Sequence, residues 1–592
     1  MVSPWYARTN SRVSAVVVAT ALAAAMPGGC TSAGATAVSS SVGLQADVVR
    51  ESECYKLDMV QHAWAAIAAA CQRAATDPEA TTGDFAVANY HIGRARNELK
   101  DYAESAVALD LALAMPGVQK ELRRRILLTS GKARLGLRDF LGAIEVLNEA
   151  LVLGPNDLDT TMQLGDAHLG IGRSDLAARD FEKVVAMAAA DSGQQARVAA
   201  VAETRLGAIA ISSGAADGLE RAARHYEAAR KWDADNVDAW LGGGAASVQL
   251  ASMRAGAEAQ ALYEQAANSY RHAMRLAPAA VDAQTGMGAA LFGLGKAGEA
   301  IGYYARAVEL APASAPRRLD LARALRRAGR LAEAERTYDE VNRLEASARS
   351  LFETADVQIA LGASDRARES LMAAQKLDPA FSGAFLGLGK LLFSEGPQHF
   401  PAARDQFREA ERLTRASDNP MRAEALYFLS RIETEGGGKD ARLAINYAEE
   451  AIALDPGPPQ YRAQACLVRI RFLSKDDVRR ASGAGPCTVS DDSAGSHLLS
   501  GMYELRVAHF AVGDDRKRNW ESAYLAFSAG RQKVEAAPEV ERPVLRERLA
   551  FGEGLALYCV GFADVGRQAI SQASTDVRAY FDMFHVARCE TY

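Results

Sequence analysis

Aromatic residues are scarce in this sequence of 592 residues, at 7% of the total. Together with abundant alanine, this scarcity favours closely packed helices. After Met26 no segment reaches about 18 consecutive apolar residues, so no later segment predicts a membrane-spanning helix. The formal net charge of −6 argues against a protein that binds the phosphate backbone of nucleic acids. The chain is several times longer than a typical domain, so it folds either as several domains or as one elongated array.

Signatures of catalysis and metal binding are also missing. Nine histidines lie singly, with no H-E-x-x-H pattern and no cysteine-histidine cluster at metal-ligand spacing. No G-x-S-x-G elbow occurs. The stretch "AALFGLGKA" from Ala289 lacks the first glycine and the last Ser or Thr of a phosphate loop. Likewise, "GMGAAL" from Gly286 lacks the last glycine of a dinucleotide fingerprint. We therefore expect no enzymatic activity, no metal and no cofactor.

The amino terminus has the layout of an export signal. Arg8 and Arg12 precede fourteen uncharged residues, Val13–Met26, and small residues then surround Cys30. Fourteen residues are too few to span a bilayer comfortably as a helix. The layout resembles a bacterial lipoprotein signal, although Pro27 stands where an aliphatic residue is usual. The resemblance implies that Cys30 is acylated.

An ordinary cleavage site competes with this interpretation. Residues 35–37, Ala-Thr-Ala, match the A-x-A pattern of signal peptidase, which would start a mature chain in solution at Val38. The expected division is a signal peptide in 1–29, followed by the lipidated cysteine and a tether in 30–48. The tether has the small and polar composition of a flexible linker.

The remaining six cysteines are grouped at the two ends, with none between residues 71 and 466. In an oxidising compartment this grouping suggests local disulfides that staple the ends of an array, where stacking partners are missing. The candidate pairs are Cys54–Cys71, Cys466–Cys487 and Cys559–Cys589. Buried free thiols are the alternative.

A repeat of about 34 residues recurs through the middle of the chain. The stretch "GRARNELKDYAESAVALDLALAMP" from Gly93 aligns with "GKARLGLRDFLGAIEVLNEALVLGP" from Gly131, and further copies begin at Leu164 and Met287. Each copy holds two apolar helical patterns with a turn between them. The repeat therefore predicts helix-turn-helix units.

The repeat resembles the tetratricopeptide repeat (TPR), which has small residues at positions 8, 20 and 27, a large residue at position 24 and proline at position 32. The matching residues are Gly131, Ala143, Leu147, Ala150 and Pro155 in one copy, and Gly288, Ala300, Tyr304, Ala307 and Pro312 in another. The resemblance implies an all-α fold, an α-solenoid in which helix pairs form a right-handed superhelix.

About ten repeats are expected in residues 83–458, after a helical cap in 49–82. Their eighth positions are Gly93, Gly131, Gly165, Gly207, Gly244, Gly288, Ala322, Ala355, Gly389 and Ser430. Five glycines are expected at the turn inside a pair, where a left-handed backbone is cheapest for glycine: Gly172, Gly214, Gly295, Gly329 and Gly362. Residues 459–592 are expected to form a diverged helical cap with a polar loop in 474–496.

The resemblance also implies a concave groove lined by positions 2, 5, 9, 12 and 13 of the first helix of each pair. The candidate groove residues are Tyr90, Arg94, Asn97, Arg125 and Lys132, then the apolar Leu241, Val248 and Phe292, and then Arg323, Arg326, Arg327, Lys390 and Phe393. Alternating basic and apolar side chains are suited to an extended or helical peptide that carries carboxylates.

Leader and repeats together resemble envelope TPR lipoproteins, a class that includes pilus-assembly lipoproteins of the tight-adherence type and outer-membrane assembly factors. The resemblance implies a scaffold without enzymatic activity, anchored in the outer membrane and facing the periplasm. Its expected partners are envelope proteins or peptides, and no nucleic acid. The alternative function is an accessory subunit that recruits an envelope enzyme of polysaccharide export or peptidoglycan assembly. The alternative location is the soluble periplasm or the medium.

Overall fold

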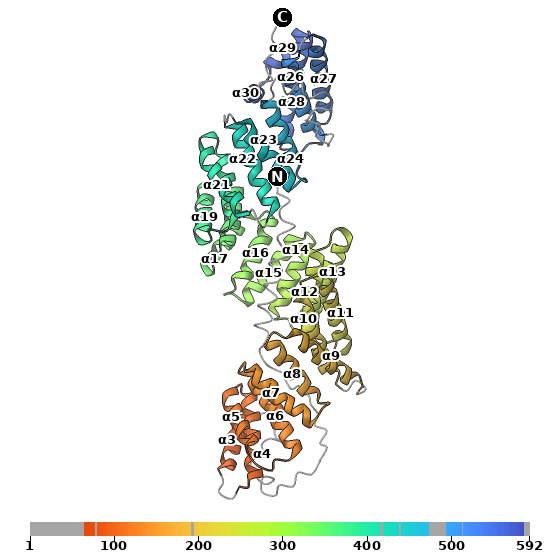
Figure 1. The fold of residues 1–592 in the computed structure, drawn as a ribbon, viewed down its shortest axis with the longest axis vertical. Helices are drawn as coiled ribbons and strands as arrows, with labels where there is room; N and C mark the ends of the chain where they lie inside the picture. The colour runs from red at the N-terminus through yellow and green to blue at the C-terminus, as the bar shows by residue number, and fades with distance from the viewer. Residues whose placement is uncertain are drawn as a thin grey trace. The chain divides into compact units, whose positions relative to one another are not determined.

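The computed structural model describes residues 64–76, 80–190, 195–212, 214–414, 418–436, 440–472, 493–511 and 513–584. These residues form 27 α-helices, two short 3-10 helices (Pro397–His399 and Val534–Ala536) and no strand (Figure 1). The predicted all-α fold is thus confirmed. The chain divides into two compact units, one up to Ala328 and one from Gly329.

The described part of the first unit consists of fourteen helices in sequence. They are α3 (Trp64–Ala75), α4 (Thr82–Glu98), α5 (Tyr102–Leu113), α6 (Lys120–Gly136), α7 (Phe140–Leu153), α8 (Leu158–Gly170), α9 (Ser174–Ala190), α10 (Ala196–Ile211), α11 (Ala216–Trp232), α12 (Val237–Ser252), α13 (Gly256–Leu276), α14 (Val281–Gly293), α15 (Ala297–Leu310) and α16 (Ala315–Arg327).

The described part of the second unit holds the remaining helices. They are α17 (Leu331–Leu344), α18 (Ala348–Ala360), α19 (Ser364–Leu377), α20 (Ser382–Ser394), α21 (Phe400–Thr414), α22 (Asn419–Glu435), α23 (Ala441–Leu454), α24 (Pro459–Phe472), α26 (Ala494–Phe510), α27 (Gly513–Gln532), α28 (Arg542–Val560), α29 (Ala563–Ser571) and α30 (Thr575–Met583).

Neighbouring helices pack in the order in which the chain makes them. In each unit the helices before α30 pack against the described helix before them, and many even-numbered helices also touch the next even-numbered helix, as α4 touches α6 and α26 touches α28. Each unit is therefore a stack of helix pairs in which every pair contacts only its neighbours. This arrangement confirms the predicted α-solenoid.

Small residues on the even-numbered helices explain how closely the paired helices approach. All ten predicted eighth positions lie on alternate helices from α4 to α22. A Cβ on Gly131 would lie 2.4 Å from Cδ2 of Leu147 in the next helix. On Gly288 it would lie 2.8 Å from Cε1 of Tyr304. The space that a side chain would fill is thus taken by the large residue at position 24.

The turns inside the pairs have the left-handed backbone that the sequence predicts. Gly172 and Gly295 have φ of 77°, and Gly214, Gly329 and Gly362 are also at positive φ. Lys100 and Arg138, at φ of 63° and 60°, occupy the corresponding turns of the first two pairs without the freedom of glycine.

Several predictions fall on residues outside the described ranges: the signal peptide, Cys30, the tether, and most of both the amino-terminal cap and the polar loop. The polar loop ends earlier than predicted, since Ser493 caps α26 by accepting a hydrogen bond from the backbone N–H of Ser496. The cysteines Cys71, Cys466 and Cys559 are disulfide-bonded. Their partners stay predictions because Cys54, Cys487 and Cys589 lie outside the described ranges.

Candidate functional site

The candidate site in each unit is the row of side chains at positions 2, 5, 9, 12 and 13 of the even-numbered helices, called the inner face below. At its start, two arginines lie over aromatic rings. The guanidinium of Arg125 on α6 is 5.5 Å from the ring centre of Tyr90 on α4, and that of Arg94 is 5.4 Å from the ring of Trp64. Tyr90 is buried and Arg125 is exposed. These predicted groove residues thus pack against each other between helices.

Two further predicted residues link α4 to α6. The Nδ2 group of Asn97 donates a hydrogen bond of 2.9 Å to the carbonyl oxygen of Thr129, and the Asn97 side chain is buried. The Nζ group of Lys132 forms an ion pair with Glu98, 34 residues earlier, at 2.7 Å. One repeat thus bonds to the next through residues that the sequence assigns to ligand binding.

The middle of the first unit is more apolar, as predicted. Leu241, Val248 and Phe292 are half-buried and pack against one cluster of buried residues. The guanidinium of Arg327 lies 4.9 Å from the ring centre of Phe292. These side chains form a strip of apolar surface on α12 and α14 with an arginine at its end.

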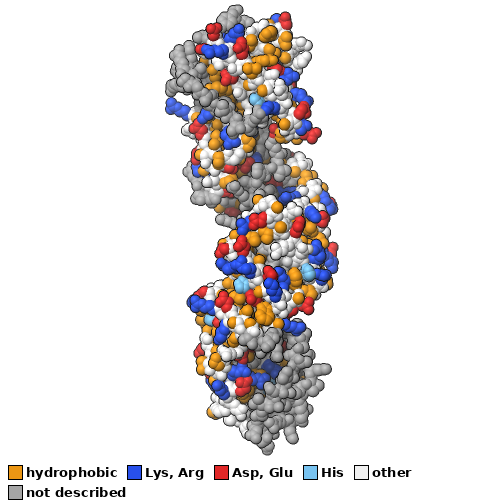
Figure 2. Space-filling model, turned by 90° about the vertical axis from the view of Figure 1, so that its right-hand side faces the viewer, with side chains coloured by type: hydrophobic (Ala, Val, Ile, Leu, Met, Phe, Trp, Pro, Cys, Tyr) orange, Lys and Arg blue, Asp and Glu red, His pale blue; other side chains and the backbone are white. Residues whose placement is uncertain are grey.

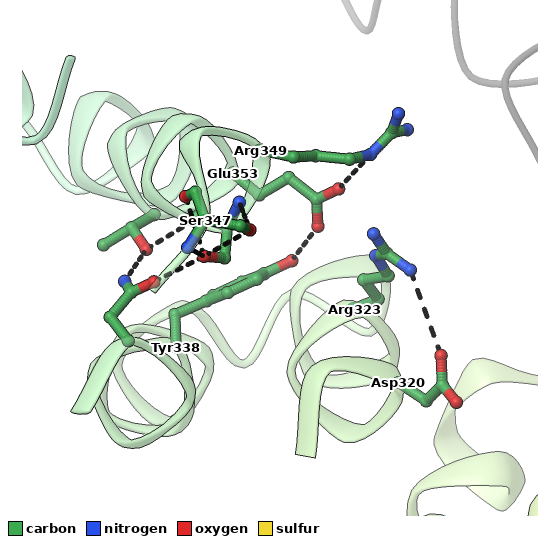
Figure 3. Close-up of polar contacts among 9 residues, drawn as sticks. Asp320, Arg323, Tyr338, Ser347, Arg349 and Glu353 are labelled. Atoms are coloured by element: carbon green, nitrogen blue, oxygen red, sulfur yellow. Dashed lines mark hydrogen bonds and ion pairs between the residues drawn. The ribbon is translucent and has the colours of Figure 1, made fainter. Parts of the chain in front are cut away.

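Three arginines follow this strip on α16. Arg323 and Arg326 are half-buried and Arg327 is exposed. Asp320 lies 3.9 Å from Arg323 on the same helix (Figure 3). One end of the inner face of the first unit therefore carries a concentration of positive charge.

In the second unit the predicted Lys390 and Phe393 on α20 lie in an aromatic cluster. Lys390 forms an ion pair of 2.8 Å with Glu424 on α22. The ring of Phe393 stacks on Phe400 with centres 4.8 Å apart, and Arg431 on α22 lies 4.5 Å above Phe393.

Arg431 was missed by the sequence analysis, although it stands at position 9 beside the predicted Ser430. Burial disfavours its charge, but the hydrogen bond to Glu435, at 2.6 Å, helps to raise its pKa above the ordinary value. Its guanidinium also approaches the rings of Tyr427 and Phe428. The charge at the centre of this cluster is therefore held permanently.

A buried polar network joins α17 to α18 in the second unit (Figure 3). The hydroxyl of Tyr338 donates a hydrogen bond of 3.1 Å to Glu353, whose carboxylate also pairs with Arg349 at 3.3 Å. Asn342 on α17 bonds to Thr354 at 2.9 Å. Because the partners come from adjacent helices, the network fixes how these helices pack.

Elsewhere the described surface offers no concentrated chemistry. Basic and acidic side chains are interspersed over the face in Figure 2. A cavity of about 900 Å³ in the first unit is lined by residues of α13, α14 and α15 and their connections, including Tyr263 and Tyr303, and by none of the predicted groove residues. Among the residues that the structure describes, no group of three or more His, Cys, Asp or Glu is arranged to hold a metal ion, and no helix is long and apolar enough to cross a membrane.

Comparison with known proteins identifies the repeats. Family models of the tetratricopeptide repeat match residues 128–195, 256–315 and 291–351. No curated protein matches the chain. Solved structures with a related fold include yeast Tom70 (14% identity, 78% of this chain and 99% of that one, TM-score 0.36). Another is the C-terminal part of a TPR repeat-containing protein from Cytophaga hutchinsonii, at 18% identity and a TM-score of 0.35, where the match covers 44% of this chain and 99% of that one. A third is YrrB, described as a TPR protein with an unusual peptide-binding site. The match has 17% identity and a TM-score of 0.27, and it covers 33% of this chain and 96% of that one. The segments 128–195 and 256–351 are thus tetratricopeptide repeats within an all-α solenoid.

Proposed function

We propose that the chain is a scaffold for protein-protein interactions that binds a segment of its partner along the inner face of the first unit. The observation that carries this proposal is the apolar strip of Leu241, Val248 and Phe292, half-exposed on α12 and α14. Apolar side chains on a preformed surface bind without the entropy cost of ordering that surface.

The charge beside the strip defines the partner's chemistry. Arg327 lies over Phe292, and Arg323 and Arg326 occupy positions 9 and 12 of the same helix, α16. Guanidinium groups pair with carboxylates in a bidentate manner. A segment with apolar side chains followed by acidic ones fits this order.

The chain performs this role at the cell envelope, anchored through acylated Cys30 and the tether of residues 30–48. The leader, the small residues before Cys30 and the linker composition support this assignment. Many weak contacts along a groove, held near their partner by an anchor, give multivalent binding. Assembly of a pilus, of secretion machinery or of the outer membrane is the proposed setting.

A photocrosslinking amino acid placed at Phe292 tests the binding surface. We expect it to capture a discrete envelope protein in intact cells, and we expect the same group at Arg306, exposed on α15, to capture nothing or unrelated proteins. Equal capture from both positions contradicts the assignment. Capture of an envelope synthase or hydrolase at Phe292 alone would instead support the accessory-subunit function.

A further inference from the structure

The last described helix, α30, turns back along the second unit. A continuing solenoid would place it against α29, yet α30 packs against α28 (Figure 1). The backbone N–H of Ser574 donates a hydrogen bond of 2.7 Å to Glu547 on α28, and this bond holds the start of α30 against that helix.

Glycines identify which face of α26 and α28 receives α30. A Cβ on Gly501 of α26 would lie 2.6 Å from Phe527, and one on Gly554 of α28 would lie 2.6 Å from Ala569, so both glycines stand where the eighth position stands in the other pairs. Counting from Gly554, Arg548 and Phe551 occupy positions 2 and 5 of α28. These are inner-face positions.

Aromatic side chains of α30 lie on those positions. The ring of Phe581 meets Phe551 edge to face at 4.9 Å, and the guanidinium of Arg548 lies 3.6 Å from the ring centre of Tyr580. Phe581 is fully buried. It shares one apolar cluster with Met502, at position 9 of α26. Helix α30 therefore occupies the inner face of α26 and α28.

The sequence of α30 has the spacing of a helix that binds in a groove. Val577, Tyr580, Phe581 and Phe584, which pack into the cluster, stand at i, i+3, i+4 and i+7, and Met583 also packs against it. Asp576 and Asp582, on the opposite side, are exposed. The inner face of this unit thus has a resident ligand of defined chemistry.

The attachment of this ligand depends on its apolar side chains rather than on a long helix. Helix α30 has nine residues, too few to be stable as a helix by itself, and it packs against α28. The residues that lead into it, Ser571, Gln572 and Ser574–Asp576, are exposed. A short helix with an exposed connection opens more readily than the longer helices beside it, although opening α30 exposes the buried Val577 and Phe581.

We propose that α30 is an exchangeable occupant of the inner face of α26 and α28, and that a partner binds there by replacing it. The partner element is a short amphipathic helix with apolar side chains at i, i+3, i+4 and i+7, two of them adjacent aromatics. Its binding is limited by competition with α30, which is always present at high effective concentration because it is covalently linked. This surface lies in the second unit and does not depend on the apolar strip of the first.

The test uses the full chain and a labelled synthetic peptide of residues 573–584 as the probe. Fluorescence polarisation compares the unaltered chain with the double variant Tyr580→Ala/Phe581→Ala, in which α30 has lost its central contacts. We expect the peptide to bind the variant about tenfold or more tightly than the unaltered chain. The matched control Asp576→Ala/Asp582→Ala changes only the exposed side of α30 and should bind like the unaltered chain. A peptide that itself carries both alanines should bind neither.

A second variant protects the test against misfolding. A Gly/Ser insertion of about ten residues between Gln572 and Ala573, compared with the unaltered chain with all disulfides reduced, keeps the contacts of α30 with α28 and lowers its effective concentration, so peptide binding should again tighten. Equal affinity of the peptide for the unaltered chain and for both variants would overturn the proposal. Dimerisation of the variants in light scattering, without tighter peptide binding, would assign the surface to α30 of a second copy and also overturn the assignment to a partner.

Discussion

Replacing Gly286 by alanine tests the close packing of helices on which the solenoid depends. A Cβ at this position of α14 would lie 2.2 Å from Cε1 and Cζ of Tyr270, a contact far inside van der Waals distance. The ring has little room to move, because it also lies close to Gly244 of α12, where a Cβ would be 2.8 Å from Cζ of Tyr270. Tyr270 is 5% exposed. Accommodating the methyl group therefore requires α14 to move.

The expected free-energy change follows from two opposed effects. Alanine in a helix interior is worth about 1 kcal/mol relative to glycine, whereas overpacking a filled core costs about 1–3 kcal/mol or more. Gly286→Ala should therefore destabilise its repeat by up to about 2 kcal/mol. The matched control is Gly302→Ala on α15, where a Cβ would meet nothing within 4 Å. This variant should stabilise by about 0.5–1 kcal/mol.

Amide hydrogen exchange of α13–α15, together with urea unfolding followed by circular dichroism, measures both variants. In a repeat array the effect of a substitution is concentrated in the nearest neighbours, so exchange should quicken locally for Gly286→Ala and slow for Gly302→Ala. If both variants changed stability and exchange in the same direction, close approach of the helices would not explain why these positions are glycine.

Three other substitutions probe separate features. Lys100→Gly removes a left-handed lysine at φ of 63° and should raise the free energy of unfolding by about 0.5–1 kcal/mol, whereas Gly295→Ala, at φ of 77°, should lower it by about 1 kcal/mol. Burial raises the pKa of Glu504 above its ordinary value of 4.5, so the folded state retains a proton that the unfolded state releases, and stability falls as pH rises from 4.5 through the raised pKa. Glu504→Gln should therefore melt at a higher temperature at neutral pH, with a flatter dependence on pH. Cys30→Ala should move the chain from the membrane fraction to the soluble fraction without loss of helical content, and unchanged fractionation would reject the lipid anchor.

The sequence predicts the features of this fold that are local and periodic. A single repeat is enough to predict that Gly295 lies in a left-handed turn, because glycine is favoured there for local reasons. Gly295 indeed has φ of 77°. The eighth-position glycines are visible because the same close approach recurs at a fixed spacing. Neither needs knowledge of a distant contact.

The groove was harder to predict than these local features, because the contacts of a groove side chain depend on the neighbouring repeat. Lys132 has the position of a ligand-binding residue, yet it pairs with Glu98 one repeat earlier, and Lys390 pairs with Glu424 one repeat later. Opposite charges 34 residues apart were a signal that the sequence contained. The return of α30 had no such signal, because it breaks the periodicity on which the prediction relied.

The arginines of the first pairs illustrate how far folding and binding share the same residues. Because Arg125 lies over Tyr90 and Arg94 over Trp64, replacing both arginines by glutamate removes two ring contacts together with two positive charges. Loss of partner capture by this double variant would fit either effect. Lysine separates them, since it keeps the charge and loses the planar stack.

Capture and stability of the Lys and Glu double variants should therefore be measured side by side. If charge recognises the partner, Arg94→Lys/Arg125→Lys should capture it nearly as well as the unaltered chain, while its free energy of unfolding falls by about 0.5–1 kcal/mol per lost ring contact. Arg94→Glu/Arg125→Glu should lose both capture and stability. Equal loss of capture in the two variants would mean that the arginines act by shaping the inner face. Full capture by the Glu variant would remove this end of the face from the binding surface.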